Sequence, residues 1–233
     1  MTRMASDDVL IITGASTGIG AATARAASQA GYRVVLAARA ADKLTALAEE
    51  LGGDERARAV PTDVTEWEEN EALLAAGLDA FGRVDAVFAN AGFGASRGWL
   101  EETPEHWRAM VLTNVLGAAY TVRAAIPALK ESRGHVFLTG SVAGRRALPG
   151  SLYSATKFAV HAMGEAIRAD LDDTGIRTTI IAPGMVETPF FSEKPSIEAL
   201  QPEDDAAAIM YAIAQPPHVD VNEILLRPTA QPT

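Results

Sequence analysis

Tyr153 and Lys157 stand four residues apart in the stretch SLYSATKFAV, at the expected start of a helix. Residues at this spacing lie on one face of a helix, so the phenol and the ammonium can meet. A phenol beside an ammonium could carry out proton chemistry. The two could equally be ordinary surface side chains, because the same spacing occurs by chance in many helices. The pair therefore needs support from other parts of the sequence.

A second candidate is the glycine-rich turn TGASTGIG at residues 13–20, between an apolar run and a helical stretch. A helix N-terminus attracts phosphate through its free N–H groups and its dipole. Gly14, Gly18 and Gly20 would allow a tight turn, close approach to a pyrophosphate and close helix–strand packing. The spacing differs from the G-x-G-x-x-G fingerprint of dinucleotide-binding folds. An ordinary strand-to-helix loop is the alternative.

The end of the second apolar run, VVLAAR, bears on the choice of cofactor. In dinucleotide-binding folds an acidic residue here accepts from the ribose 2′-hydroxyl, whereas an arginine accommodates a 2′-phosphate. Arg39 stands at this point, and the first carboxylate, Asp42, lies inside the next helix. We therefore expect NADP(H), with NAD(H) as the alternative. Arg39 could also be a solvated charge, and Thr17 stands where a basic residue would have strengthened the prediction.

Short apolar runs alternate with longer alanine-rich stretches along the chain. We expect strands at 9–13, 32–38, 57–63, 84–90, 135–141, 176–184 and 223–228. We expect helices that end near 29, 81 and 174, and others over 40–51, 104–129 and 203–214. This order predicts an α/β fold, a Rossmann-type doubly wound parallel sheet of about seven strands with helices on both faces. We expect residues 1–233 to form a single NAD(P)-binding domain, with a substrate-side flap at 188–202.

Composition limits the possible functions. The chain has 20 basic and 30 acidic residues, and the resulting net charge of −10 argues against a nucleic-acid partner. The absence of cysteine excludes disulfides and thiolate catalysis and fits a cytoplasmic location. The four histidines lack the close helical spacing of a metal site, so no metal is expected. The first residues show no signal-peptide core and the apolar stretches fall short of a membrane span, so no membrane partner is expected.

Motifs spread in order over nearly the whole chain resemble those of the classical short-chain dehydrogenases/reductases. They are TGASTGIG (13–20), Asp63-Val64, NAG (90–92), NVLG (114–117), GSVAG (140–144), YSATK (153–157) and PG (183–184) followed by Thr188. Each motif alone is weak, but their order and separations together are specific. The lack of a basic residue at Thr17 is one departure.

The resemblance implies an oxidoreductase that acts on a small carbonyl or secondary-alcohol substrate through a tetrad of Asn114, Ser141, Tyr153 and Lys157. Ser141 would bond the substrate oxygen, and Tyr153 would be the general acid in reduction and the base in oxidation. Lys157 would bind the nicotinamide ribose and, with the oxidised nicotinamide, lower the pKa of the phenol. Asn114 would hold a water that links Lys157 to solvent. Taken singly, Ser141 could instead cap a turn and Asn114 could bond a neighbouring backbone.

The resemblance also implies which residues contact the cofactor. Besides Tyr153 and Lys157 they are Gly14, Ser16, Thr17, Gly18, Ile19, Gly20, Arg39, Asp63, Val64, Asn90, Ala91, Gly92, Pro183, Gly184, Val186 and Thr188. It implies self-association through the helices that contain Asn114 and Tyr153, as a homodimer or homotetramer.

The substrate side is expected to be mostly apolar, which suggests a ketone or alcohol with a hydrophobic body. The candidate wall residues are Phe93, Val142, Ala143, Leu148, Met185, Phe190 and Phe191. Phe190 and Phe191 could instead pack under a short helix. Arg145 and Arg146 could attract an anionic substrate, or be structural or exposed.

Two other functions compete with catalysis of this kind. A nucleotide-sensing or regulatory protein could keep the fold and lose turnover, but the complete tetrad argues against it. A non-redox, dehalogenase-like relative would replace the lysine of YxxxK by arginine and lose the glycine turn. Lys157 and TGASTGIG are both present, so this function ranks last.

Overall fold

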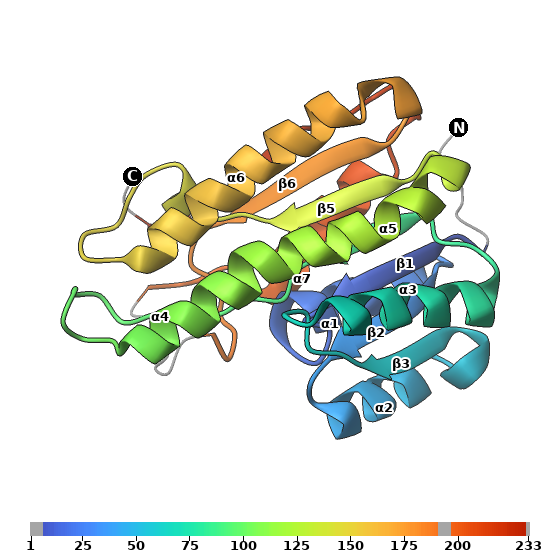
Figure 1. Cartoon of the computed structure of the whole chain (residues 1–233), viewed down its shortest axis with the longest axis horizontal. Helices are drawn as coiled ribbons and strands as arrows, with labels where there is room; N and C mark the ends of the chain where they lie inside the picture. The colour runs from blue at the N-terminus through green and yellow to red at the C-terminus, as the bar shows by residue number, and fades with distance from the viewer. Residues whose placement is uncertain (1–6, 191–196, 232–233) are drawn as a thin grey trace.

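The computed structural model describes residues 7–190 and 197–231 and is built on a seven-stranded parallel sheet in the order β3-β2-β1-β4-β5-β6-β7 (Figure 1). The predicted fold class is confirmed, and every strand end lies within two residues of its expected place. The strands are β1 (Val9–Thr13), β2 (Arg33–Ala38), β3 (Ala57–Pro61), β4 (Ala86–Ala89), β5 (His135–Thr139), β6 (Arg177–Pro183) and β7 (Glu223–Leu226).

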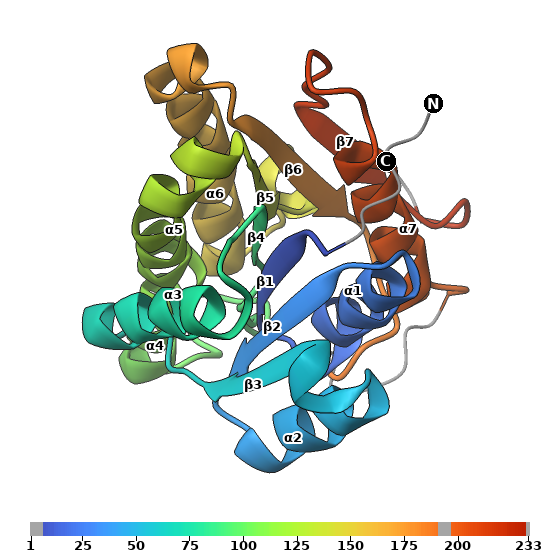
Figure 2. The same cartoon turned by 90° about the vertical axis from the view of Figure 1, so that its right-hand side faces the viewer.

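Helices cover both faces of the sheet, as Figure 2 shows from the side. One layer contains α1 (Gly18–Gln29), α2 (Ala41–Glu50) and α7 (Pro202–Ile213). The other layer contains α3 (Trp67–Phe81), α5 (Ala118–Ser132) and α6 (Leu152–Asp170), with α4 (Pro104–Val111) leading into α5. Short 3₁₀ turns occur at η1 (Gly53–Glu55), η3 (Val142–Gly144) and η4 (Asp172–Thr174).

The central strand β1 shows why the strands are apolar on both sides. Leu10 and Ile12 point into the layer of α1, α2 and α7, whereas Val9 and Ile11 point into the layer of α3, α5 and α6. All four are fully buried. Successive side chains of a strand face opposite sides of the sheet, so a strand covered on both faces needs apolar residues at every position.

The long helix expected over 104–129 is confirmed and runs over Pro104–Ser132, but it contains a π turn that the sequence analysis did not predict. A π-helical turn, η2 (Leu112–Gly117), separates α4 from α5 and contains Asn114. The Asn114 amide is bonded outside the helix: its Oδ1 accepts from Phe93 N over 3.0 Å and its Nδ2 donates to Phe93 O over 2.9 Å. A π turn accommodates one extra residue in a helix and is frequent at functional sites.

The stretch Pro104–Ser132 is long and apolar enough to cross a membrane by length and composition, contrary to the expectation that no stretch approaches a membrane span. Core helices of soluble proteins pass the same test. The α5 part packs on β4, β5 and α3, and its Ala125 and Leu129 are fully buried there. Contact with the sheet accounts for this apolar face.

Candidate active site

The candidate site lies at the carboxyl edge of the sheet. Thr13, Ala89, Thr139 and Pro183 end β1, β4, β5 and β6, and most of the predicted site residues follow them directly. β1 pairs with β2 on one side and with β4 on the other. The chain runs from β1 to β2 and β3 on one side and then crosses back to β4 on the other, and such a switch point opens a crevice where ligands bind in α/β sheets.

The glycine-rich turn joins β1 to α1 and leaves the start of α1 open. Gly14 and Gly18 have φ angles of +65° and +54°, which favour glycine. A Cβ at position 20 would lie 2.3 Å from the Gly14 carbonyl oxygen, so Gly20 allows the turn to close. Thr17 immediately precedes α1, and its side chain accepts no capping hydrogen bond from the described residues. The Ala21 N–H donates to Thr17 O over 3.3 Å, which leaves the N–H groups of Gly18, Ile19 and Gly20 uncapped and suited to a phosphate.

Asn90 ties the glycine turn to the neighbouring strands. Its Nδ2 donates to Thr13 O and its Oδ1 accepts from Thr139 Oγ1, both over 3.0 Å. The backbone N–H groups of Asn90 and Ala91 donate to Thr13 Oγ1. The Asn90 side chain therefore holds the ends of β1, β4 and β5 together. Contact of Asn90, Ala91 and Gly92 with a cofactor stays a prediction.

Arg39 and Asp63 share one electrostatic environment beyond the ends of β2 and β3. Burial acts to raise the pKa of Asp63, but two hydrogen bonds from Thr65 and the charge of Arg39 lower it overall. The Thr65 N–H and hydroxyl donate to Asp63 Oδ1 over 3.0 and 2.8 Å. Arg39 is exposed. Its guanidinium is therefore accessible at the place where an adenosine 2′-phosphate was expected.

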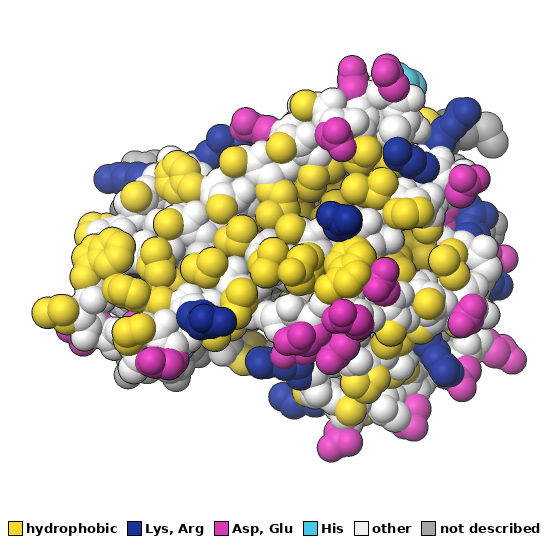
Figure 3. Space-filling view, in the orientation of Figure 1, with side chains coloured by type: hydrophobic (Ala, Val, Ile, Leu, Met, Phe, Trp, Pro, Cys, Tyr) yellow, Lys and Arg dark blue, Asp and Glu magenta, His cyan; other side chains and the backbone are white. Residues whose placement is uncertain are grey.

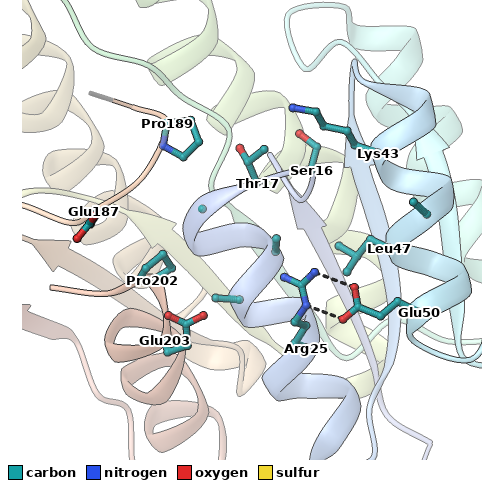
Figure 4. A pocket seen from close by; sticks show the side chains of 14 residues that line it. Ser16, Thr17, Arg25, Lys43, Leu47, Glu50, Glu187, Pro189, Pro202 and Glu203 are labelled. Carbon is teal, nitrogen blue, oxygen red and sulfur yellow. Dashed lines mark hydrogen bonds and ion pairs between the residues drawn. The ribbon is translucent and has the colours of Figure 1, made fainter. Parts of the chain in front are cut away.

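A cleft of about 420 Å³ adjoins the glycine turn between α1, α2 and the start of α7 (Figure 4). Ser16, Thr17 and Gly18 form part of its wall, and Lys43 extends from α2 toward Ser16. At its base Arg25 is paired with Glu50, with Nε 2.6 Å from Oε1. Lys43 was not among the predicted residues, although its position four residues after Arg39 was a usable signal.

Three of the four predicted catalytic residues converge beyond β5. Ser141 precedes η3, and its Oγ accepts from Ala143 N over 3.0 Å. Tyr153 and Lys157 lie on successive turns of α6, with Lys157 Nζ 5.6 Å from the centre of the Tyr153 ring. Lys157 Nζ also donates to Thr139 O over 2.6 Å. Strand β5 and helix α6 thus hold the hydroxyl, the phenol and the ammonium together.

Asn114 reaches this group through Thr156. Its Nδ2 donates to Thr156 Oγ1 over 3.2 Å, in addition to its bonds with the Phe93 backbone. The alternative that Asn114 bonds a neighbouring backbone is therefore realised. Its proposed role of holding a water stays a prediction.

Burial controls the ionisation of the phenol and the ammonium. It raises the pKa of Tyr153 to about 12, and hydrogen bonding with the Ser141 side chain opposes that rise. It lowers the pKa of Lys157 to about 8. The lowering of the phenol pKa that we expected is not produced by the protein's own groups, because desolvation outweighs the hydrogen bond. At neutral pH the phenol therefore keeps its proton.

The predicted substrate wall is only partly assembled. The Phe190 ring lies edge-on to Tyr153 at 5.5 Å, and a Cβ at Gly94 would lie 2.6 Å from that ring. The Phe93 ring packs against His106 at 5.2 Å. Met185, Leu148 and Val142 are half-buried, whereas Ala143 is fully buried in η3 and therefore does not line a wall. Phe191 and residues 191–196 of the flap expected at 188–202 lie outside the described residues.

The segment after β6 closes over the glycine turn. A Cβ at Gly18 would lie 3.1 Å from Thr188 Cγ2, so Thr188 lies beside the start of α1. Val186 is buried and forms a parallel bridge with Leu200. Val186 and Val64 are both buried, and contact of either residue with a cofactor stays a prediction.

Two further residues of this region escaped the sequence analysis. Gln231, from the C-terminal segment, accepts a hydrogen bond from Met185 N over 2.9 Å at its Oε1. No local pattern connects residues so far apart in the sequence. His161 lies one turn beyond Lys157 and touches the Ser141 loop. Its spacing from Tyr153 and Lys157 by successive steps of four was a signal for one shared helix face.

Comparisons with known proteins agree with this geometry. The family model of the short chain dehydrogenases matches residues 8–199. An uncharacterised oxidoreductase of Staphylococcus haemolyticus is 44% identical over 224 residues, which cover 94% of this chain and 96% of the relative.

Solved structures show the same fold over nearly the whole length. An alcohol dehydrogenase from the archaeon Thermococcus sibiricus, in complex with 5-hydroxy-NADP, is 33% identical with a TM-score of 0.91, covering 98% of this chain and 99% of that chain. A serine dehydrogenase in its closed form with NADP⁺ is 29% identical with a TM-score of 0.91, over 97% and 96% of the two chains. A short-chain dehydrogenase/reductase from Burkholderia phymatum with NAD is 28% identical with a TM-score of 0.86, over 97% and 90%. The chain belongs to the short-chain dehydrogenase family of oxidoreductases.

Proposed function

We propose that this protein is an NADP-dependent oxidoreductase that interconverts a small carbonyl compound and its secondary alcohol, with Tyr153 as the proton donor and acceptor. The observation that carries the proposal is the convergence of Ser141, Tyr153 and Lys157 beside the open start of α1. Structural neighbours that bind NADP or 5-hydroxy-NADP support it.

The residues around the glycine turn fit a nicotinamide dinucleotide. The uncapped first turn of α1 would bind the pyrophosphate, and Arg39 and Lys43 would face a 2′-phosphate. Lys157 would bind the nicotinamide ribose, with residues 183–188 over the ring. Hydride transfer is the chemistry that the nicotinamide supplies when bound. NAD(H) is the alternative cofactor, since one structural neighbour contains NAD.

The protein's own groups would orient the substrate and move a proton. Ser141 Oγ would hold the substrate oxygen next to the phenol. The high pKa of Tyr153 keeps its proton in place for donation in the reductive direction. Lys157, with a pKa of about 8, remains largely cationic at neutral pH and would stabilise the phenolate that donation leaves behind.

The substrate would have an apolar body. The Phe190 ring packs edge-on against Tyr153, and the Phe93 ring and the half-buried Met185 would complete the wall of the substrate site. These side chains would exclude water from the carbonyl and bury aliphatic or aromatic carbon.

We also propose that the chain self-associates. Hydrophobic side chains gather over α4, α5 and α6 on the face shown in Figure 3, and they include the exposed Val111 and Phe158. Light scattering of the purified protein would test for a homodimer or homotetramer, and a monomer would contradict this part of the proposal.

A panel of ketones, aldehydes and secondary alcohols, assayed with NADPH, NADH and their oxidised forms, tests the function. Tyr153→Phe should lower kcat at least about a thousandfold on any substrate found, because the proton donor is gone. The variant should still bind NADPH, measured by fluorescence. Wild-type activity in Tyr153→Phe would contradict the mechanism. Tight cofactor binding by the native protein with no turnover on the whole panel would favour a nucleotide-sensing role instead.

A further inference from the structure

His161 lies directly beneath the loop that carries Ser141. It is on α6, one turn beyond Lys157, and is almost fully buried. Tyr153, Lys157 and His161 follow one another at intervals of four and therefore share one face of the helix. The proposed mechanism makes no use of this imidazole.

Gly140 and Gly144 allow the loop that contains Ser141 to pack closely against the His161 ring. A Cβ at Gly140 would lie 2.6 Å from His161 Nε2, and one at Gly144 would lie 2.5 Å from His161 Cδ2. Both distances are far below a normal carbon contact, so any other residue at either position would push the loop off the ring. The loop from 140 to 144, with Ser141 inside it, is thus fitted around His161.

A hydrogen bond connects this ring to the backbone of Ser141. The Ser141 N–H donates to His161 Nε2 over 3.4 Å. A nitrogen that accepts carries no proton, so the neutral ring holds its proton on Nδ1, a tautomer assigned from the hydrogen bond. His161 Nδ1 lies 3.7 Å from Glu223 Oε1 on β7.

The groups facing the ring keep it neutral. Burial is the largest influence and lowers the pKa of His161; Glu223 raises it, and the charges of Arg145 and Lys157 lower it. Arg145 is itself bonded to Glu223, with Nε 3.0 Å from Oε1. Two more distant charges act on this pair, Glu165 on Arg145 and Arg168 on Glu223. The charge of the Glu223 carboxylate, which would favour a charged imidazole, is therefore largely neutralised by Arg145.

We propose that His161 is a positioning residue for Ser141, and that the Arg145–Glu223 pair keeps its Nε2 free to accept from the Ser141 backbone. This inference rests on the proposed function of Ser141. Protonation of the ring would place an N–H opposite the Ser141 N–H, and the loop would move away from the phenol. Activity should therefore fall at acid pH as His161 becomes charged.

Replacements at His161 separate hydrogen bonding from simple packing. His161→Gln supplies an amide oxygen that accepts without titrating, so kcat near neutral pH should stay within about threefold of the native value and the acidic decline should disappear. His161→Leu removes the acceptor, so kcat should fall about tenfold with KM changed less than about twofold.

Replacements in the ion pair should move the acidic decline in opposite directions. Arg145→Gln leaves Glu223 unopposed, so the midpoint of the kcat–pH profile should shift to higher pH. Glu223→Gln removes the carboxylate and should shift the midpoint to lower pH. A merely structural pair would produce no such opposite shifts.

His135 provides the matched control. It is also a fully buried histidine, and its Nε2 pairs with Thr179 Oγ1 over 2.7 Å at the amino end of β5, away from Ser141. His135→Gln should leave the kcat–pH profile unchanged, whatever it does to the melting temperature.

A spectroscopic measurement does not depend on turnover. In ¹⁵N-labelled protein, the Ser141 amide signal should move with the titration of the His161 ring and should stop moving in His161→Gln. If no substrate is found but this coupling is seen, the proposed function fails and the positioning contact stands. An acidic decline that persists in His161→Gln, native kcat in His161→Leu, or a Ser141 amide that ignores the ring would overturn the inference.

Discussion

Asp85 at the amino edge of the sheet and Lys157 and Asp205 at the carboxyl edge differ in how their charges are matched. At the amino edge Asp85 accepts from Val9 N over 2.8 Å and is bonded twice by Arg83, so its charge is matched. At the carboxyl edge Lys157 and Asp205 are buried without an opposite charge bonded to them among the described residues. Burying an uncompensated charge costs stability, so it persists where it has a use.

This difference suggests that the two edges of the sheet have different roles. The amino edge would contribute to stability and little to activity, and the carboxyl edge would contribute to activity at some expense of stability. Substitutions at each edge test these roles, because activity and the free energy of unfolding are measured separately.

Lys157→Met should have the largest effect, and on activity alone. Loss of the cation beside Tyr153 should lower kcat/KM about a thousandfold. Because burial lowers the Lys157 pKa to about 8, the native fold disfavours this charge, so its removal should not lower the free energy of unfolding. Steady-state kinetics and urea denaturation measure the two quantities. Lys130→Met, in the last turn of α5, is the control and should change neither.

Asp205→Asn should stabilise the protein in a pH-dependent way. Burial raises the Asp205 pKa to about 7, and the neighbouring Asp204 adds to the rise. The folded state therefore binds a proton that the unfolded state has lost, and native stability should fall as pH rises from about 4 to about 7. Above that range the variant should be more stable by roughly 2–4 kcal/mol, which is the size of the shift at about 1.4 kcal/mol per pKa unit.

Asp204→Asn is the matched control for this pH dependence. Asp204 accepts from Gln201 N at the start of α7 and is more exposed than Asp205. Its replacement should weaken the helix cap slightly and keep the decline in stability between acid and neutral pH. If the native protein and Asp205→Asn show the same dependence in urea titrations, the unpaired carboxyl at this edge has no energetic cost.

Asp85→Ala should produce the reverse pattern at the amino edge. The change leaves the Val9 N–H without its acceptor and takes two hydrogen bonds from Arg83, which keeps its ion pair with Asp8, so the free energy of unfolding should fall by about 2 kcal/mol. Because the residue lies across the sheet from Tyr153, kcat should be unchanged. Asp54→Ala, in the exposed pair with Arg58, is the control and should alter stability by less than about 0.5 kcal/mol. Loss of activity in Asp85→Ala without loss of stability would contradict the comparison.

The sequence predicted the fold and the convergence of Ser141, Tyr153 and Lys157 because both depend on local patterns. Apolar runs placed the strands, and the spacing of Tyr153 and Lys157 placed them on one helix face. What it missed depends on contacts between distant segments. Gln231 reaches Met185 from the end of the chain, and the π turn at Asn114 depends on bonds to Phe93. The expected lowering of the phenol pKa involves Lys157 together with a bound oxidised nicotinamide and stays a prediction; the protein's own groups raise that pKa through burial, which a local sequence pattern does not reveal.

Arg39→Asp tests the smallest difference, a preference between two cofactors at the carboxyl end of β2. Arg39 is exposed, so its interaction with a 2′-phosphate is screened by solvent, and the variant should weaken NADPH binding only about tenfold while strengthening NADH binding. Fluorescence titration with both cofactors measures the ratio. Arg58→Gln, an exposed arginine on β3 paired with Asp54, should leave the ratio unchanged. If Arg39→Asp leaves the ratio of NADPH to NADH affinity unaltered, either Lys43 makes the 2′-phosphate contact or the case for NADP is lost. Lys43→Gln separates these two outcomes, because it should change the affinity ratio only if Lys43 makes the contact.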